Sequence, residues 1–152
     1  MLRCDGNVNI NSDIIIGDRT YTKIDQLPQV VIIANNINIS SNVTRLDAWL
    51  IATSRDAEST GSADGNINTC SDFAPSQTPS DGACSSKLVV NGPVIAGKVY
   101  LNRTYGALPG DGSIEPAEVF NLRADTYLWA YSQSEDYHQV ITTYSRELAP
   151  RY

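Results

Sequence analysis

Residues 29 to 53 read QVVIIANNINISSNVTRLDAWLIAT, and this stretch decides the fold. Its β-branched residues favour strands, while Asn and Ser interrupt it too often for one continuous helix. Polar and apolar residues alternate from 36 to 39, as in a strand with one buried face. No part of it approaches the ~18 continuous apolar residues of a membrane-spanning helix. We therefore expect short strands in a soluble domain, without direct membrane insertion.

The composition limits the class of protein. The chain has 152 residues, of which 41% are hydrophobic, enough for one domain with a buried core. The formal net charge is −6 and the lysines form no basic cluster, so a nucleic acid partner is not expected. No signal-peptide pattern precedes the first alternating stretch, GNVNIN at 6 to 11. We interpret the chain as part of a longer exported protein whose signal lies upstream; the alternative is a complete cytoplasmic protein.

A repeat of eighteen residues is interrupted by two insertions. Residues 35 to 52 align without gaps with residues 65 to 70 joined to residues 85 to 96. The aligned pairs include Asn36 with Asn66, Ile37 with Ile67, Asn38 with Asn68, Leu46 with Val90, and Leu50 with Val94. The segments left over, at 53 to 64 and 71 to 84, are rich in Ser, Asp, Gly and Pro, as surface loops are. Partial copies on both sides indicate roughly three to four units.

Stacked repeats bury an apolar side that one repeat cannot bury alone. Alternation assigns one set of residues to the interior, namely Val8, Ile10, Ile37, Ile39, Ile67, Thr69, Val99 and Leu101. The opposite set faces outward, namely Asn7, Asn9, Asn11, Asn36, Asn38, Ser40, Asn66, Asn68, Lys98, Tyr100 and Asn102. The predicted fold class is all-β, a short parallel β-solenoid (β-helix) with coils of about 18 residues, two loop insertions and a C-terminal cap. A β-sandwich, whose strands also alternate, is the alternative.

We expect a single domain over residues 1–152, with solenoid coils at 5–104 and a capping region at 105–152. In the cap, residues 116–133 predict one or two short helical turns, and residues 138–147 alternate as a final strand. A cap is needed because an open coil end exposes unpaired backbone. The aromatic residues expected to cover the last coil are Phe120, Tyr127, Trp129, Tyr131, Tyr137 and Tyr144.

Two of the three cysteines flank the second insertion. A disulfide between Cys70 and Cys84 would close the base of that loop and stabilise the fold by roughly 3 kcal/mol. Disulfides form in oxidising compartments, so the bridge would indicate export. Two free thiols in a cytosolic protein are the alternative, and Cys4 is left without an assigned partner. A zinc site is poorly supported, because CxxC is absent and His138 is the only histidine.

Acidic residues offer few candidates for catalysis. Glycoside cleavage uses paired carboxylates, but spacing singles out no pair among Asp47, Asp56, Glu58, Asp64, Asp111, Glu115 and Glu118. No nucleophile motif accompanies His138, so we assign no catalytic residue and consider an enzyme unsupported. Asp111, Glu115 and Glu118 form a weak candidate calcium site, because the run lacks the alternating oxygen ligands of an EF-hand loop. Nucleotide-binding motifs are absent, and no cofactor is predicted.

The outward asparagines are the most suggestive surface. Side-chain amides can hydrogen-bond to sugars, and a nearby tyrosine ring can stack on them. The candidate ligand face consists of Asn36, Asn38, Asn66, Asn68, Tyr100 and Asn102. The other interpretation is an asparagine ladder, in which aligned amides bond along the stack and stabilise it without a ligand.

Several tracts carry a resemblance. IIANNINI, VTRLDAWLIA, CSSKLVVNGPVIAGKVYLNRTYGA, PAEVFNL and YSRELAPRY resemble the C-terminal regions of large, uncharacterised exported proteins of uncultivated small-genome bacteria. That resemblance covers most of the chain and implies export but no activity. The alternating rows are also similar to bactofilin-type polymer-forming β-helices, which lack disulfide-flanked insertions.

These observations predict a non-enzymatic structural or adhesive module of a bacterial surface protein, located outside the cell. Its partner would be a surface glycan or another surface protein. Two alternatives remain, a glycan-binding or glycan-cleaving β-helix and a self-polymerising scaffold.

Overall fold

The computed structural model describes residues 1–17, 20–53, 64–73, 83–106 and 115–136. The chain divides into two compact units. The larger unit comprises Met1–Thr20 and Pro28–Arg123, and the smaller comprises Tyr21–Leu27 and Ala124–Tyr152.

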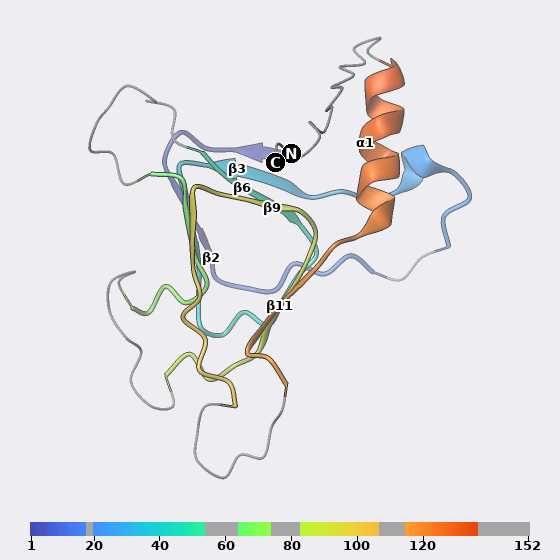
Figure 1. Ribbon diagram of the computed structural model, residues 1–152. Coiled ribbons are helices and arrows are strands. Elements are labelled where there is room, and N and C mark those ends of the chain that lie inside the picture. Colours follow the sequence, from blue (N-terminus) through green and yellow to red (C-terminus); the bar gives the residue numbers. More distant parts are fainter. Residues whose placement is uncertain (18–19, 54–63, 74–82, 107–114, 137–152) are drawn as a thin grey trace, which may run out of the picture. The chain divides into compact units, whose positions relative to one another are not determined.

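Three parallel sheets form the larger unit and lie on three sides of a triangle in Figure 1. Sheet A has the order β1 (Leu2–Arg3), β3 (Val31–Ala34), β6 (Trp49–Ala52), β9 (Val94–Ile95). Sheet B has the order β10 (Lys98–Tyr100), β7 (Asn66–Asn68), β4 (Asn36–Ile39), β2 (Asn7–Ile10). Sheet C has the order β11 (Glu118–Asn121), β8 (Leu88–Asn91), β5 (Arg45–Leu46), and Ile14 forms a further parallel bridge to Leu46.

The chain enters sheets A, B and C in turn, and each passage is called a layer here. Layer 1 spans residues 1–17, layer 2 residues 30–46, layer 3 residues 49–91 and layer 4 residues 94–122. Each layer lies beside the next in all three sheets, because every strand pairs with the strand of the following passage.

The strand register confirms the repeat alignment. The pairings include Asn36 with Asn66, Ile37 with Ile67, Asn38 with Asn68, Leu46 with Val90, and Leu50 with Val94. Val8 and Val99 continue the Ile37 and Ile67 row at its two ends. All strand pairs among the described residues are parallel, whereas a β-sandwich requires antiparallel pairs. The described residues are therefore mostly β, in three parallel sheets with one α-helix and one 3-10 helix, in agreement with the predicted all-β class.

The core lies between the three sheets. Its buried apolar residues are Ile10, Ile32, Ala34, Ile37, Ile39, Val43, Leu46, Ala48, Leu50, Ala52, Ile67, Leu88 and Val90. Alternation explains this set, since Ile37 and Ile39 of β4 are 0% exposed while the intervening Asn38 is partly exposed. Each fully buried aliphatic side chain contributes roughly 1.5–3 kcal/mol.

Leu101 differs from its predicted interior position, because 62% of its surface is exposed. The Thr69 N–H still donates to the Tyr100 carbonyl (3.1 Å), but the N–H of Asn102 donates to the Thr69 hydroxyl (2.9 Å) instead of a backbone carbonyl. The chain thus leaves the sheet at this point, and alternation no longer directs Leu101 inward. The other seven residues assigned to the interior are buried or partly buried.

The sheets extend beyond the predicted coil range of 5–104. At one end β1 pairs with β3, and at the other β11 pairs with β8. The strand β11 occupies residues for which helical turns were expected, and the helix α1 (Ala124–Asp136) begins three residues after it. The final strand predicted at 138–147 lies outside the described residues, as do Tyr137 and Tyr144.

The smaller unit contains α1 and the 3-10 helix η1 (Ile24–Gln26), which contact each other. Thr126 of α1 is 1% exposed, whereas Tyr127, Leu128 and Tyr131 are each more than half exposed.

Candidate functional surface

Two rows of mainly polar side chains run across the outer face of sheet B and are called the polar rows. Strand register places Asn7, Asn36, Asn66 and Lys98 in the first row and Asn9, Asn38, Asn68 and Tyr100 in the second. Asn102 follows β10 and contacts the second row. The structure thus brings all six residues of the predicted ligand face together on one side of the sheet.

Amide groups of the polar rows hydrogen-bond one another between layers. The pairs, donor first, are Asn36 to Asn7 (2.9 Å), Asn38 to Asn9 (3.0 Å), Asn66 to Asn36 (3.2 Å) and Asn102 to Asn68 (2.9 Å). An equivalent bond joins Asn121 to Asn91 on sheet C (2.9 Å). The amides therefore form a ladder of the kind that the sequence suggested beside a ligand site.

Additional contacts occupy other groups of these rows. Asn68 donates to the Phe73 carbonyl (3.0 Å) and is only 3% exposed. The Lys98 ammonium lies 4.4 Å from the centroid of the Tyr100 ring, a cation–π contact. That ammonium covers one face of the ring, so the face is not open for stacking on a sugar.

The predicted disulfide is present between Cys70 and Cys84, with a Cα–Cα distance of 6.1 Å. Both residues are buried, and Cys84 has a φ of 56°, in the left-handed region. Thr104 of layer 4 also binds the end of this loop. Its N–H donates to the Cys84 carbonyl (3.1 Å), and its hydroxyl donates to the Ala83 carbonyl. The base of the second insertion is therefore fixed to layer 4. Cys4 is a free, partly buried thiol.

Arg103 is a buried cation that no pattern in the sequence indicates. It is 8% exposed, and its guanidinium donates to backbone carbonyls of Ser40, Ser41, Thr69 and Ser86 at 2.7 to 3.3 Å. Its backbone N–H donates to Glu118 Oε1 (2.9 Å). Burial lowers the pKa of the guanidinium, an effect that nearby carboxylates, first that of Glu118, oppose. Arg103 thus connects layers 2, 3 and 4 between sheets B and C.

Asp47 is a buried carboxylate between sheets C and A. It is 2% exposed and accepts hydrogen bonds from the Ile16 N–H (2.9 Å), the Arg45 guanidinium (3.0 Å twice) and the Asn91 amide (2.7 Å). Burial acts to raise the pKa of Asp47, but the hydrogen bonds outweigh it and hold the pKa below its usual value. The sequence places Asp47 near a surface insertion, whereas the structure gives it an internal connecting role.

The weak calcium candidates do not form a described site. Asp111 lies outside the described residues, Glu115 accepts from the Lys87 ammonium (2.7 Å), and Glu118 accepts from Thr69 and Arg103. The hydrogen bond from Lys87 lowers the pKa of Glu115. Within the described part of the chain, no group of three or more His, Cys, Asp or Glu side chains has the arrangement of a metal site.

Of the other acidic candidates, the structure describes Asp64. Asp64 accepts from Asn36 (2.8 Å) at the margin of the polar rows, while Asp56, Glu58 and His138 lie outside the described residues.

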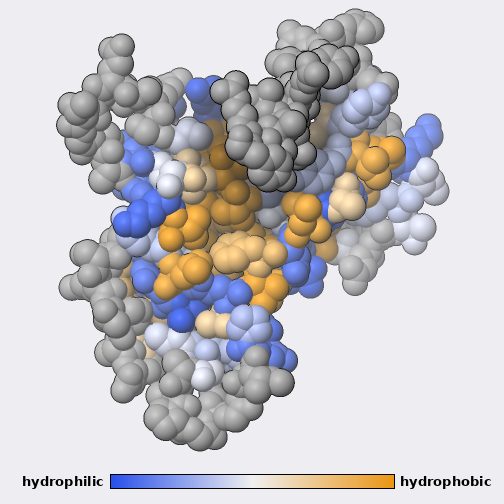
Figure 2. Space-filling model, in the orientation of Figure 1, coloured by the Kyte–Doolittle hydropathy of each residue, from blue (hydrophilic) through white to orange (hydrophobic). Residues whose placement is uncertain are grey.

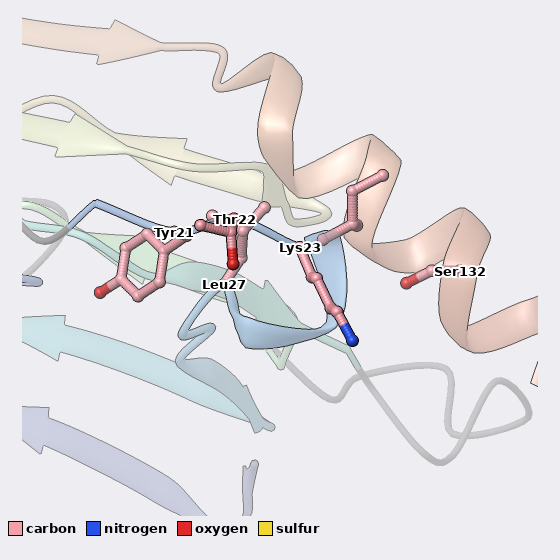
Figure 3. Close-up of a pocket in the computed structure, with 6 residues that line it drawn as sticks. Tyr21, Thr22, Lys23, Leu27 and Ser132 are labelled. Atoms are coloured by element: carbon pink, nitrogen blue, oxygen red, sulfur yellow. The ribbon is translucent and has the colours of Figure 1, made fainter.

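A groove in the smaller unit is shown in Figure 3. Its lining residues are Tyr21, Thr22, Lys23, Ile24, Leu27 and Ser132. Ser132 belongs to α1, and its hydroxyl donates to the Trp129 carbonyl (2.8 Å). The six lining residues include one ammonium, that of Lys23, and three hydroxyls, but no carboxylate or imidazole.

No protein-family model, curated protein or solved structure matches the sequence. Among the described residues, no helix has both the length and the apolar character required to cross a bilayer.

Proposed function

We propose that the larger unit is a short parallel β-solenoid whose coils are the four layers. We further propose that it serves as a non-enzymatic structural or adhesive module of an exported bacterial surface protein. The observation that carries the proposal is the amide ladder of the polar rows, because these side chains direct their hydrogen bonds to neighbouring layers.

The contacts of the acidic residues support the same function. Asp13 of layer 1 accepts from the Thr44 N–H (2.7 Å), the Arg45 N–H (3.1 Å) and the Thr44 hydroxyl (2.8 Å) of layer 2. Asp47 connects layers 1 and 3, and Glu118 of layer 4 accepts from the Thr69 hydroxyl of layer 3 (2.6 Å). A glycosidase needs a pair of carboxylates that face its substrate. These three carboxylates instead accept hydrogen bonds that join neighbouring layers.

The Cys70–Cys84 disulfide supports a location outside the cell, because such bridges persist in non-reducing environments. In that location the partners accessible to the module are surface glycans and other surface proteins. The amide bonds between layers favour a role in building or spacing the surface over a dedicated sugar site.

Substitution of a ladder residue combined with a glycan-array screen tests this proposal. We expect Asn38→Ala to lower the free energy of unfolding by about 0.5–1.5 kcal/mol through loss of a hydrogen bond. Substitution of the exposed Ser12 by Ala, off the rows, serves as the control and should change it by less than about 0.5 kcal/mol. Wild type and both variants should give only background signal on the array.

Saturable binding of a glycan by the wild type that Asn38→Ala abolishes would contradict a purely structural role. That result would establish the predicted ligand face. Release of reducing sugar ends from the bound glycan would instead show a glycan-cleaving β-helix.

A further inference from the structure

Exposed apolar side chains of the larger unit gather in its first and last layers. Among the described residues, its exposed large hydrophobics are Met1 (88%), Leu2 (52%), Ile15 (59%), Ile95 (52%), Leu101 (62%), Phe120 (41%) and Leu122 (69%). All seven belong to layer 1 or layer 4. Figure 2 shows apolar side chains gathered in the middle of the triangle formed by the sheets. The inner layers cover each other, whereas the end layers present apolar surface.

The same two layers carry the sheet edges. In the strand order, β1 and β9 end sheet A, β2 and β10 end sheet B, and β11 ends sheet C beside β8. Among the described residues, no other strand is hydrogen-bonded to the outer edge of these strands. Such edges present unpaired N–H and C=O groups that template pairing with another strand.

We propose that layer 1 of a second copy of this chain stacks on layer 4, head to tail. This inference rests on the structural function proposed above and names its partner. Register defines the contacts, because each layer repeats the rows of the one before it. In sheet A, Leu2 of the second copy extends the row that contains Leu50 and Val94. In sheet B, its Val8 lies beside Val99.

The outer face provides a charge-complementary contact at the same junction. Residues 64–66 repeat the sequence Asp-Gly-Asn of residues 5–7 at the corner between sheets A and B. Asp64 accepts from Asn36, the row residue of the preceding layer (2.8 Å). Lys98 occupies the place of Asn36 in the last layer, so Asp5 of the second copy meets Lys98. An ammonium and a carboxylate thus meet at the junction, where inner layers have an amide and a carboxylate.

The backbone of this corner continues the same pattern. The N–H of Asn35 donates to the Gly6 carbonyl (3.0 Å), that of Gly65 to Asn35 (2.7 Å), and that of Gly97 to Gly65 (2.8 Å). These hydrogen bonds form a column along the corner, and the Gly97 carbonyl is the next acceptor in it. In the stacked arrangement, the Gly6 N–H of the second copy donates to that carbonyl. Because the two contacting surfaces differ, the contact leaves a free end on each copy and generates filaments instead of closed dimers.

Charge exchange at the junction tests the proposal. The full chain in a Cys4→Ser background, which prevents intermolecular disulfides, is examined by sedimentation over a range of concentrations and by negative-stain microscopy. We expect wild-type assembly to grow with concentration into unbranched filaments. Asp5→Lys and Lys98→Glu should each raise the concentration for assembly at least about tenfold, since like charges then face each other. Lys23→Glu, a matched charge change outside both end layers, should leave assembly unchanged.

The two single variants, when mixed, should recover assembly. In an alternating order, each junction then pairs either the two native residues, Asp5 with Lys98, or the two substituted ones, whose charges are also opposite. The double variant should recover assembly alone. A chain that stays monomeric at millimolar concentration overturns the inference, as does a closed dimer or an assembly indifferent to both charge changes. Background glycan binding by such a monomer would leave the proposed structural role standing, whereas specific glycan binding would favour an adhesive role over the structural one, whatever the oligomeric state.

Discussion

Replacement of Asp47 by Ala should strongly destabilise the larger unit. The substitution removes a 2% exposed carboxylate and leaves the Ile16 N–H and the Asn91 amide without their acceptor. Hydrogen bonds to a charged acceptor contribute about 1.5–3 kcal/mol each. The Arg45 side chain is 47% exposed and returns to water, so its loss adds only about 0–1 kcal/mol. We therefore expect a decrease of about 3–7 kcal/mol in the free energy of unfolding.

Urea unfolding followed by circular dichroism at pH 7 measures this decrease. Arg45→Ala is the control, because it removes the half-exposed guanidinium but leaves Asp47 bonded to Ile16 and Asn91. It should cost less than about 1 kcal/mol. Equal, small losses for both variants would refute the conclusion that the buried hydrogen bonds of Asp47 join the layers.

The pH dependence of stability provides a second readout for Asp47. Its pKa in the folded chain lies below the value of about 3.9 expected when unfolded. The carboxylate therefore contributes fully above that pH, and the contribution is lost as the pH falls through the lower folded pKa. Asp47→Asn should flatten the loss of stability below about pH 4. Identical slopes for wild type and variant would show that the charge of Asp47 is not involved.

Three further results are expected. Gly92→Ala should prevent folding or lower the free energy of unfolding by more than about 3 kcal/mol, because φ is +156° and the new Cβ would lie 2.3 Å from the Ala48 carbonyl oxygen. Gly17→Ala is the control and should be nearly neutral in the same urea assay, because its new Cβ would have no atom within 4 Å. Reduction of Cys70–Cys84 should lower stability by about 3 kcal/mol, and non-reducing mass spectrometry should detect the link between these two residues; free thiols there would remove the argument for export. Arg103→Met should lower the free energy of unfolding by about 2–4 kcal/mol by leaving buried carbonyls without donors, and an unchanged urea midpoint would contradict its connecting role.

The rows of sheet B could be predicted from sequence because alternation with a period of two survives insertions. Asn36 and Asn66 are thirty positions apart, yet each begins the same polar and apolar pattern. The Cys70–Cys84 bridge was equally visible, since two cysteines flank one loop-like segment. Both predictions depend on residue types that repeat at matched positions in the chain.

Arg103 and Asp47 could not be recognised from sequence for a physical reason. The guanidinium of Arg103 binds backbone carbonyls of residues 17 to 63 positions away. Every residue supplies the same backbone carbonyl, so the partner leaves no signature in the sequence. Asp47 likewise uses the N–H of Ile16, and its position beside a surface-like segment resembles that of a solvated carboxylate. The exposed Leu101 shows the converse limit, because alternation cannot indicate where a strand ends.

Contacts at the corners between sheets add to the register that the strands set. Strands of two to four residues form few ladder bonds, so register within them depends mainly on which side chains face the core. Each corner, however, has a contact that spans layers: the backbone column from Gly6 to Gly97, Arg103, and Asp47. A slip in any layer would break one of these contacts and leave a buried polar group unpaired, at about 1–3 kcal/mol each. Both insertions lie between strands of different sheets, that is, at a corner. They therefore change the length of a layer without changing which residues pair.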